Sequence, residues 1–287
     1  MNNKKFSKWL AAYKPLAKEI LGDAYPKAIR GMSFTELHAY RYRLTLQKLT
    51  QSISMQPEDC ILDIGPFPGG WASLLHEYYD QRLKIDLIGL GMTPEFKDNL
   101  DADNIRFIDF DIDSENPICK NPGQEIPMTT ARYRTVSLLE TIEHFFNPLP
   151  VLHKIRESLT QDGLLILTTD NPSWFGFAYQ MLRYRKSPWG PVQESHLFNK
   201  SDWRPHIRLY NLQDLAFMLE HAGMHIIDSS YFNDHFGLYA LKNGKLKFRL
   251  GIKPLLAKFL SLLLPVQLWA NRILIVAASK KKIGNGE

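Results

Sequence analysis

Apolar positions along the chain recur with two different periods, one helical and one typical of strands. Residues 4–21 repeat apolar side chains at helical spacing with lysines opposite, and Pro15 is expected to break or kink this helix. Residues 34–52 predict a second helix. After them, apolar runs alternate with amphipathic segments: the predicted strands are 60–65, 84–90, 104–110, 133–140, 163–169, 224–232 and 271–279, and the predicted helices among them are 71–79, 148–159 and 212–223.

Strands that alternate with helices predict an α/β fold with a sheet covered on both faces. We expect residues 1–54 to form an N-terminal helical segment and residues 55–287 to form the main domain. Two stretches interrupt the alternation, at about 172–210 and 240–268. The first is rich in aromatic and basic residues, and the second contains a predicted apolar-basic helix over 246–268. Insertions of this kind commonly build the substrate side of an α/β enzyme.

Charge is distributed unevenly along the 287 residues, although the net charge is only +5. Residues 1–30 carry seven Lys or Arg and two acids, and residues 240–287 carry ten and one, so the middle of the chain is acidic. Basic ends rich in apolar residues suit an anionic membrane surface or an acidic partner; the alternative is solvated lysines on ordinary amphipathic helices. The acidic middle and the lack of a recognisable nucleic-acid-binding module argue against nucleic acid as a partner.

Cysteine use and hydropathy bear on the location of the protein. Cys60 and Cys119 form no framework of pairs, which predicts a reducing, cytoplasmic setting. No His, Cys, Asp or Glu residues show metal-ligand spacing, so we expect no metal. Lys8 and Lys14 interrupt any signal-peptide core, and the longest uncharged run, 259–271, is shorter than the ~18 residues a membrane span needs. We expect a cytoplasmic protein, with the inner membrane face as one setting.

The stretch ILDIGPFPGG, residues 61–70, is typical of a turn that binds a nucleotide-like cofactor. A P-loop is excluded because no Gly-Lys-Ser/Thr ending follows. In a dinucleotide-binding turn, Gly65 and Gly70 could be the outer glycines, but the side chain of Phe67 would block close approach of a pyrophosphate. A cofactor without phosphate groups would tolerate Phe67 better.

Five segments in order carry a resemblance to the class I S-adenosylmethionine-dependent methyltransferases, in particular the group with E-x-x-E-H after the fourth strand. The segments are LDIGPFPG (62–69), RFIDFDID (106–113), LLETIEHFFNP (138–148), LTQDGLLILTTDNP (159–172) and PHIRLYNLQDLAFMLEHAGM (205–224). The resemblance covers about residues 55–232 and implies a Rossmann-like, seven-stranded mixed sheet. It also implies S-adenosylmethionine as the cofactor.

Carried over residue by residue, the resemblance implies a cofactor site around the first turn. Asp63 would order the turn and the methionine amino end, and Asp111 would accept a hydrogen bond from the adenine amino group. The family's acid after the second strand, which grips the ribose, is missing because Gly91 stands there. The full set of implied cofactor residues is Asp63, Gly65, Pro66, Phe67, Gly69, Gly91, Met92, Asp111, Ile112, Leu139 and Glu140.

An oxygen or nitrogen acceptor that starts protonated needs a base. His144 and His206 are the leading candidates, and His196 and Asp170 are the others. His144 could instead be a structural histidine at a helix start, and His206 could merely cap a strand. Basic residues of the first insertion, such as Arg183 and Arg204, could hold an anionic group of the acceptor, or could simply be solvated.

The sequence therefore predicts a methyltransferase that acts on a small molecule or saccharide, in a setting such as surface polysaccharide or lipid-linked precursor modification. Two alternatives stay open. One is a nucleotide-sugar or NAD-linked Rossmann enzyme, against which Phe67 counts. The other is a noncatalytic binding module with the same fold, which the glycine at position 91 favours.

Overall fold

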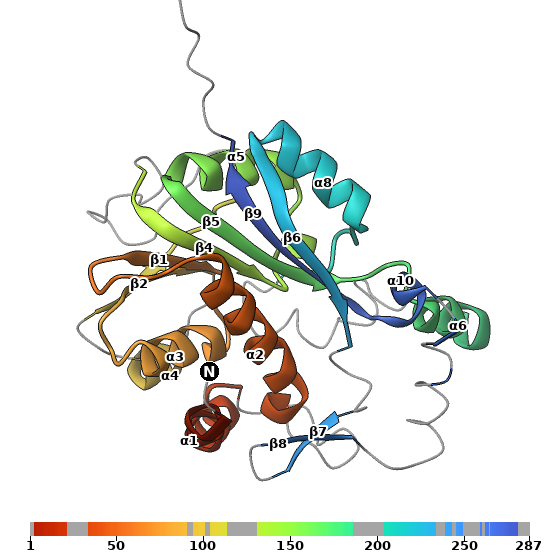
Figure 1. Ribbon diagram of the computed structural model, residues 1–287, viewed down its shortest axis with the longest axis horizontal. Coiled ribbons are helices and arrows are strands. Elements are labelled where there is room, and N and C mark those ends of the chain that lie inside the picture. The colour runs from red at the N-terminus through yellow and green to blue at the C-terminus, as the bar shows by residue number, and fades with distance from the viewer. Residues whose placement is uncertain are drawn as a thin grey trace, which may run out of the picture.

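The fold is a seven-stranded sheet with helices on both faces, as predicted (Figure 1). The strand order is β3-β2-β1-β4-β5-β9-β6. The first five strands pair in parallel, and β9 runs antiparallel between β5 and β6, which makes the sheet mixed. The bounds are β1 Cys60–Ile64, β2 Lys84–Gly89, β3 Ile105–Asp109, β4 Tyr133–Leu139, β5 Leu159–Asp170, β6 Met224–Phe232 and β9 Arg272–Ser279.

This computed structural model describes most of the chain. The described residues are 3–21, 34–90, 94–100, 104–113, 131–185, 204–233, 239–242, 245–248, 259, 262, 263 and 265–280. The predicted candidates Gly91, Met92 and His196 lie outside them.

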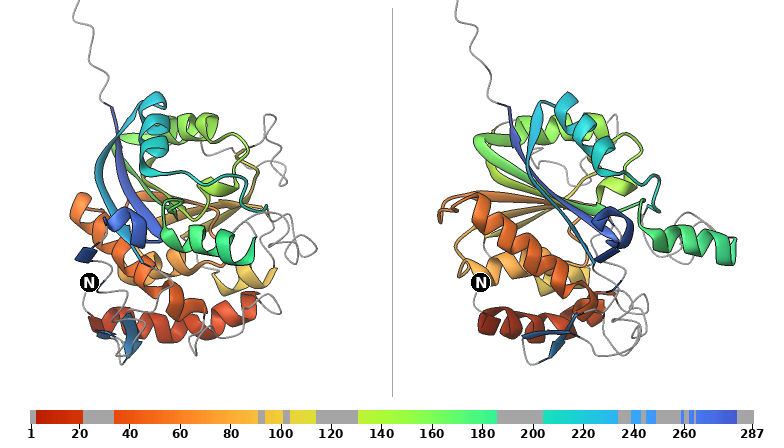
Figure 2. Two further views of the ribbon diagram at one scale, coloured as in Figure 1. Left: turned by 90° about the vertical axis from the view of Figure 1, so that its right-hand side faces the viewer. Right: turned by 45° about the vertical axis from the view of Figure 1, so that its right-hand side comes forward.

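Two layers of helices enclose the sheet (Figure 2). Alternate residues of each central strand point to opposite faces, so Ile61 and Leu87 pack in one core and Leu62 and Ile88 in the other. The strands are apolar on both faces because both faces are covered. One layer contains α1 (Asn3–Leu21), α2 (Phe34–Ser52), α3 (Gly70–Tyr78) and α4 (Pro94–Asn99), and the other contains α5 (Pro148–Ser158) and α8 (Leu212–His221).

The N-terminal helix α1 packs on the sheet domain. Trp9 and Tyr13 are buried, and the Tyr13 hydroxyl donates to the carbonyl of Pro68 at 2.8 Å. The apolar side of this helix, which we considered as a membrane-facing surface, therefore belongs to the core. Pro15 does not end the helix as expected, since α1 continues to Leu21, and Pro15 itself is exposed.

Two further segments connect β6 to β9. Strand β7 (Tyr239–Lys242) pairs with β8 (Lys245–Phe248) in a separate two-stranded sheet. The prediction of a helix over 246–268 is therefore wrong at its start, where residues 246–248 are a strand. The dipeptide Asn243–Gly244 between the two strands is a hairpin signal that could have indicated this. The short helix α10 (Val266–Trp269) precedes β9, and α6 (Phe175–Tyr184) follows β5.

Candidate functional site

A pocket opens at the edge of the sheet where the parallel strands reach their carboxyl ends. In open α/β sheets, ligands bind at this edge, beside the point where the strand order reverses. In this chain the order reverses between β1 and β4. The pocket is lined by Ile64, Gly65, Pro66, Phe67, Ile88, Gly89, Leu90, Phe110, Asp111, Ile112, Glu140, Thr141, His144, Phe145 and Arg204.

The turn after β1 forms one wall of the pocket. Gly65 and Gly69 have φ angles of 71° and 91°, which favour glycine. A side chain at Gly69 would also meet Leu100, because an added Cβ would lie 2.5 Å from its Cδ1 atom. The ring of Phe67 is partly exposed beside the ring of Phe96, with 5.9 Å between centroids. The glycines thus permit a tight turn whose exposed side chain is aromatic.

Asp63 lies buried beneath this turn. The hydroxyl of Ser137 on β4 donates to its Oδ1 atom at 2.7 Å. Its Oδ2 atom, also buried, has no hydrogen-bond partner among the described residues. Burial raises the pKa of Asp63 to about 7, although the hydrogen bond from Ser137 opposes the rise. This carboxyl group is therefore poised to ionise when a cation or donor approaches.

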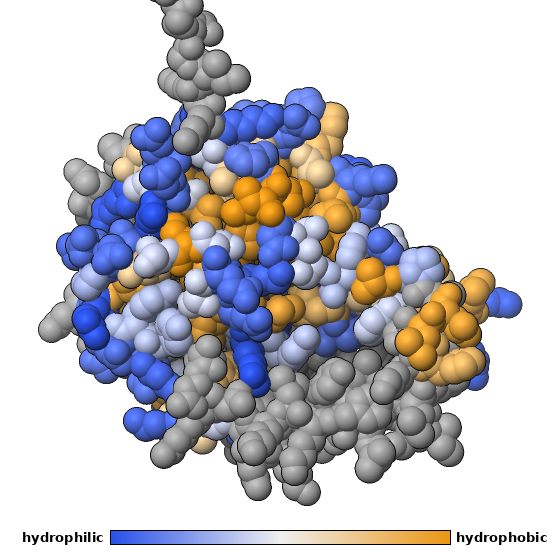
Figure 3. Space-filling view, in the orientation of Figure 1, coloured by the Kyte–Doolittle hydropathy of each residue, from blue (hydrophilic) through white to orange (hydrophobic). Residues whose placement is uncertain are grey.

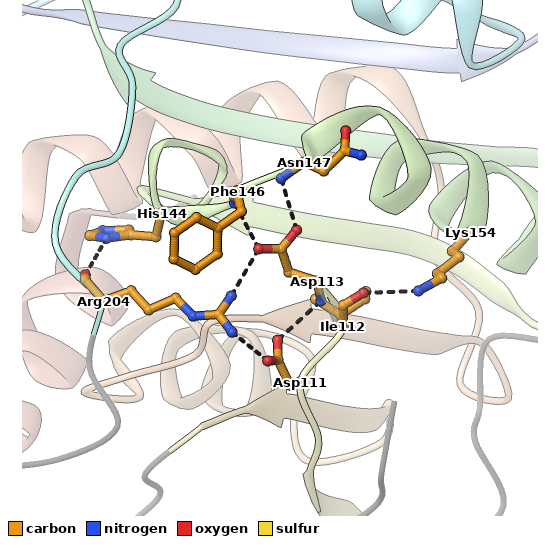
Figure 4. A network of polar contacts seen from close by, with 8 residues as sticks. All are labelled: Asp111, Ile112, Asp113, His144, Phe146, Asn147, Lys154 and Arg204. Carbon is orange, nitrogen blue, oxygen red and sulfur yellow. Dashed lines mark hydrogen bonds and ion pairs between the residues drawn. The ribbon is translucent and has the colours of Figure 1, made fainter. Parts of the chain in front are cut away.

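A polar network crosses the opposite wall (Figure 4). Arg204 donates to the carboxylates of Asp111 and Asp113, and its guanidinium lies over the ring of Phe146. Asp113 also accepts from the backbone N–H groups of Phe146 and Asn147, just before α5, at 2.7 and 3.1 Å. Asp113 is thus a buried structural acid, whereas Asp111 is a quarter exposed and lines the pocket.

Two histidines meet beside the pocket, and one of them, His144, lines it. The ring centroids of His144 and His206 are 4.6 Å apart. His144 Nδ1 lies 2.6 Å from the carbonyl oxygen of Arg204, which fixes the ring. His206 Nε2 lies 3.6 Å from Glu143 Oε1 and 3.8 Å from Asp170 Oδ2, and both acids are buried.

Glu143 is ionised in this setting. Burial alone would raise its pKa, but the interactions with the side chains of His206 and His144 lower it to about 2. The hydroxyl of Thr169 donates to its Oε2 atom at 2.9 Å. The backbone of Glu143 also holds the His206 segment, because its carbonyl accepts from the N–H of Ile207 at 2.8 Å.

A buried charge cluster extends from these acids. Arg272, at the start of β9, pairs with Asp170 and, at 3.1 Å, with Glu140. Arg41 of α2 contacts the same Glu140 carboxylate at 3.5 Å. Glu140 has a φ angle of 58°, and its Oε1 atom accepts from Thr168 at 2.9 Å. The E-x-x-E-H segment is therefore held by α2, β5 and β9 together.

The same residues could hold a metal ion. Ligand atoms of Glu143, His144 and His206 all lie within 4.8 Å of one another, and so do those of Glu140, Glu143 and Asp170. The sequence expectation of no metal-ligand spacing considered close neighbours along the chain. His206 is 62 positions from His144, so folding assembles a donor set that local spacing does not display.

The structure places the predicted site residues in three groups. Seven of them line the pocket: Gly65, Pro66, Phe67, Asp111, Ile112, Glu140 and His144. Asp63, Gly69, Leu139 and His206 adjoin it without lining it, whereas Gly91 and Met92 lie outside the described residues. Three further residues of the site, Glu143, Asp113 and Thr141, were not among the predicted site residues. Glu143 precedes His144 directly, a signal that could have identified it.

Comparison with known protein families identifies the family of this chain. Residues 36–229 match a family model described as a methyltransferase domain. No curated protein matches the chain.

Solved structures share the fold at low sequence identity. A Galdieria sulphuraria protein proposed to be a sarcosine dimethylglycine methyltransferase has a TM-score of 0.54 and 12% identity, over 94% of this chain and 98% of that one. A Mesorhizobium loti S-adenosylmethionine-dependent methyltransferase has a TM-score of 0.51 and 11% identity, over 84% and 97%. An S-adenosylmethionine-dependent methyltransferase from Archaeoglobus fulgidus has a TM-score of 0.50 and 12% identity, over 85% of this chain and 99% of that one.

Proposed function

The chain belongs to the methyltransferase domain family, and from this premise we propose that it transfers the methyl group of S-adenosylmethionine to an oxygen or nitrogen of a small molecule or saccharide. The observation that carries the proposal is the pair His144–His206 beside the pocket, with His206 Nε2 3.6 Å from the buried Glu143 carboxylate. The family match overturns the alternative of a nucleotide-sugar or NAD-linked enzyme.

The cofactor would occupy the pocket between the β1 turn and Asp111. Asp63 would order the β1 turn and accept a hydrogen bond from the ammonium group of the cofactor's methionine portion. Its buried carboxyl group has one oxygen, Oδ2, without a hydrogen-bond partner among the described residues. Asp111 would accept from the adenine amino group beside Ile112 and Phe110. The methyl group would then point toward His144, which lines the same pocket.

Transfer requires an acceptor lone pair in line with the carbon–sulfur bond. The acceptor's O–H or N–H proton would pass to the imidazole of His206, in its uncharged form, as the new bond to the methyl carbon forms. The carbon–sulfur bond breaks at the same time, and the sulfonium becomes a neutral thioether. The nearby side chains of Glu143 and Asp170 would stabilise the imidazolium that results.

The donor set also supports a second route to the same product. A divalent cation held by Glu143, His144 and His206 would act as a Lewis acid and lower the pKa of a bound acceptor hydroxyl. The two routes differ in their response to a chelator. Turnover that withstands EDTA favours the base, and loss of turnover that Mg²⁺ or Mn²⁺ restores favours the cation.

The experiment is a two-stage assay. Calorimetry first measures binding of S-adenosylhomocysteine, with NAD as the control ligand. The protein is then incubated with methyl-labelled cofactor and a panel of sugars, sugar phosphates and small amines, and the S-adenosylhomocysteine formed is quantified by mass spectrometry. Binding of NAD in preference to S-adenosylhomocysteine would contradict the proposal. Cofactor binding without transfer to any acceptor of the panel would support a noncatalytic module instead.

A further inference from the structure

Helix α6 leaves an apolar face exposed. Phe175, Tyr179 and Leu182 are 42%, 57% and 83% exposed, and their spacing of four and three places them on one side of the helix. The opposite side is already buried, since Trp174 and Phe177 are 7% and 5% exposed. The helix therefore packs on the protein through its buried side, and the exposed apolar side is not needed for that packing.

A second exposed apolar segment lies beside it. Phe259, Leu262 and Leu263 are in helical conformation and are 57%, 77% and 64% exposed. Val266 continues their spacing at the start of α10, and α10 packs against α6. Figure 3 shows the apolar surface at α6, at the right of the view. We call the exposed apolar residues of these segments, apart from Met181 on the other side of α6, the α6–α10 face: Phe175, Tyr179, Leu182, Phe259, Leu262, Leu263, Val266 and Leu268.

Concentration in one place distinguishes this face from ordinary surface. It contains eight of the fourteen large apolar side chains that are exposed in the described part of the chain. Single exposed apolar residues are normal, whereas a contiguous apolar patch marks a surface that binds a partner or a membrane.

The charged residues within the two stretches of sequence that carry the face are all basic. Residues 171–193 and 240–280 contain no Asp or Glu, whereas Arg183 and Arg185 are exposed on and just after α6. The second stretch adds Lys253 and Lys258 close to Phe259 in sequence. Apolar side chains flanked only by basic ones match an interfacial element that binds anionic lipid. We propose that the α6–α10 face docks on a membrane surface that contains anionic lipid.

The face is coupled to the candidate site through one residue. Asn171 follows Asp170 at the end of β5, and its Nδ2 atom donates to the carbonyls of Gln267 and Ala270, both at 2.7 Å. The Asn171 N–H also donates to Asn271 at 2.9 Å, next to the Arg272 that pairs with Asp170. Docking would therefore hold the pocket edge of the sheet near the lipid surface, where a lipid-linked acceptor would be presented.

Docking of this kind is peripheral. Among the helices that the structure describes, none is both long and apolar enough to cross a bilayer. The burial of the apolar side of α1 removes our other candidate surface, so the α6–α10 face is the part of the described chain to test.

The experiment is co-sedimentation of the full chain with phosphatidylcholine vesicles, with and without phosphatidylglycerol. Two variants test the face, Tyr179→Glu/Leu182→Glu and Leu262→Glu/Leu263→Glu. Phe217→Glu is the matched control, since Phe217 on α8 is 63% exposed but lies outside the face. We expect binding to need phosphatidylglycerol and to weaken with salt. Each double variant should bind about tenfold more weakly, while the control binds like the wild type.

Three outcomes would overturn the proposal. One is an absence of binding by the wild type at low salt, and another is equal loss of binding in Phe217→Glu. The third is a wild-type dimer in light scattering that both double variants convert to monomer without vesicle binding, which would assign the face to a second copy of the chain. None of these outcomes depends on methyl transfer, so the docking proposal and the proposed function can fail separately.

Discussion

The Nε2 atom of His206 lies 3.6 Å from Oε1 of Glu143, a carboxylate with no exposed surface. These residues come from two segments that the backbone joins directly, because the Ile207 N–H donates to the Glu143 carbonyl. An ionised buried acid beside an imidazole favours the protonated ring. The pair is thus suited to take up a proton and to stabilise the charge that results.

Replacing His206 by Ala should lower turnover by ~100-fold or more, because the proton acceptor is lost, while binding of S-adenosylhomocysteine changes little. Glu143→Gln should lower turnover in the same direction, since a neutral amide does not stabilise an imidazolium. Single-turnover kinetics and calorimetry measure the two effects separately. His153→Ala, an exposed histidine on α5, is the control. Full activity in both site variants would leave proximity alone as the source of catalysis.

Stability should depend on pH through Asp63. Its pKa is about 7 in the folded protein against an ordinary value of 3.8, so between these values the unfolded chain releases a proton that the folded protein keeps. The free energy of unfolding should therefore fall as the pH rises through this window, by on the order of 4 kcal/mol. Asp63→Asn should remove most of this dependence in urea unfolding at about pH 4 and about pH 8. An unchanged slope in the variant would show that another group titrates.

Gly69→Val should abolish the rise in melting temperature that S-adenosylhomocysteine gives to the wild type. Valine is strained at a φ angle of 91°, and its Cβ would collide with Leu100, so the turn would have to move. Gly223→Val is a matched control because Gly223 has a φ angle of 79° but lies at the far end of α8, near Arg156. The control should lose stability and keep the ligand-induced shift; loss of the shift in both would indicate a general folding defect.

Replacing Asp111 and replacing Asp113 should have different effects, the first on ligand affinity and the second on stability. Asp111→Ala should weaken S-adenosylhomocysteine binding by about tenfold or more, since a hydrogen bond to a charged group contributes about 1.5–3 kcal/mol. Asp113→Ala removes the acceptor for Phe146 and Asn147 and one partner of Arg204, so it should mainly lower the melting temperature. Differential scanning fluorimetry with and without ligand distinguishes them. Equal ligand affinity in Asp111→Ala and wild type would place the adenine elsewhere.

The strands and helices could be predicted because their signals are local. Residues 34–52 and 224–232 were predicted with the bounds that the structure shows. The turn from Gly65 to Gly69 could be located for the same reason, since a tight turn after a buried strand needs glycine where φ is positive.

The relationships that make the site depend on distant residues. Glu143 and His206 meet only because the chain returns along α5, β5 and α6 to the pocket edge, and no pattern in either segment specifies this contact. In the sequence, Arg204 is one of several basic residues of an insertion and has no evident partner. In the folded protein its guanidinium donates to both Asp111 and Asp113. For residues 246–248, apolar-basic content predicted a helix, but cross-strand pairing with β7 prevailed.

Strand β9 is the last strand in the sequence but lies inside the sheet, so the sheet is completed late during synthesis. This strand is made after both of its neighbours in the sheet, β5 and β6, and it separates them. A nascent chain that has not yet reached residue 272 has two open strand edges, which are prone to wrong pairing. The acids Asp170 and Glu140 of such a chain also lack Arg272, which later pairs with both. The charge balance of the candidate site is thus established by the same late step that closes the sheet.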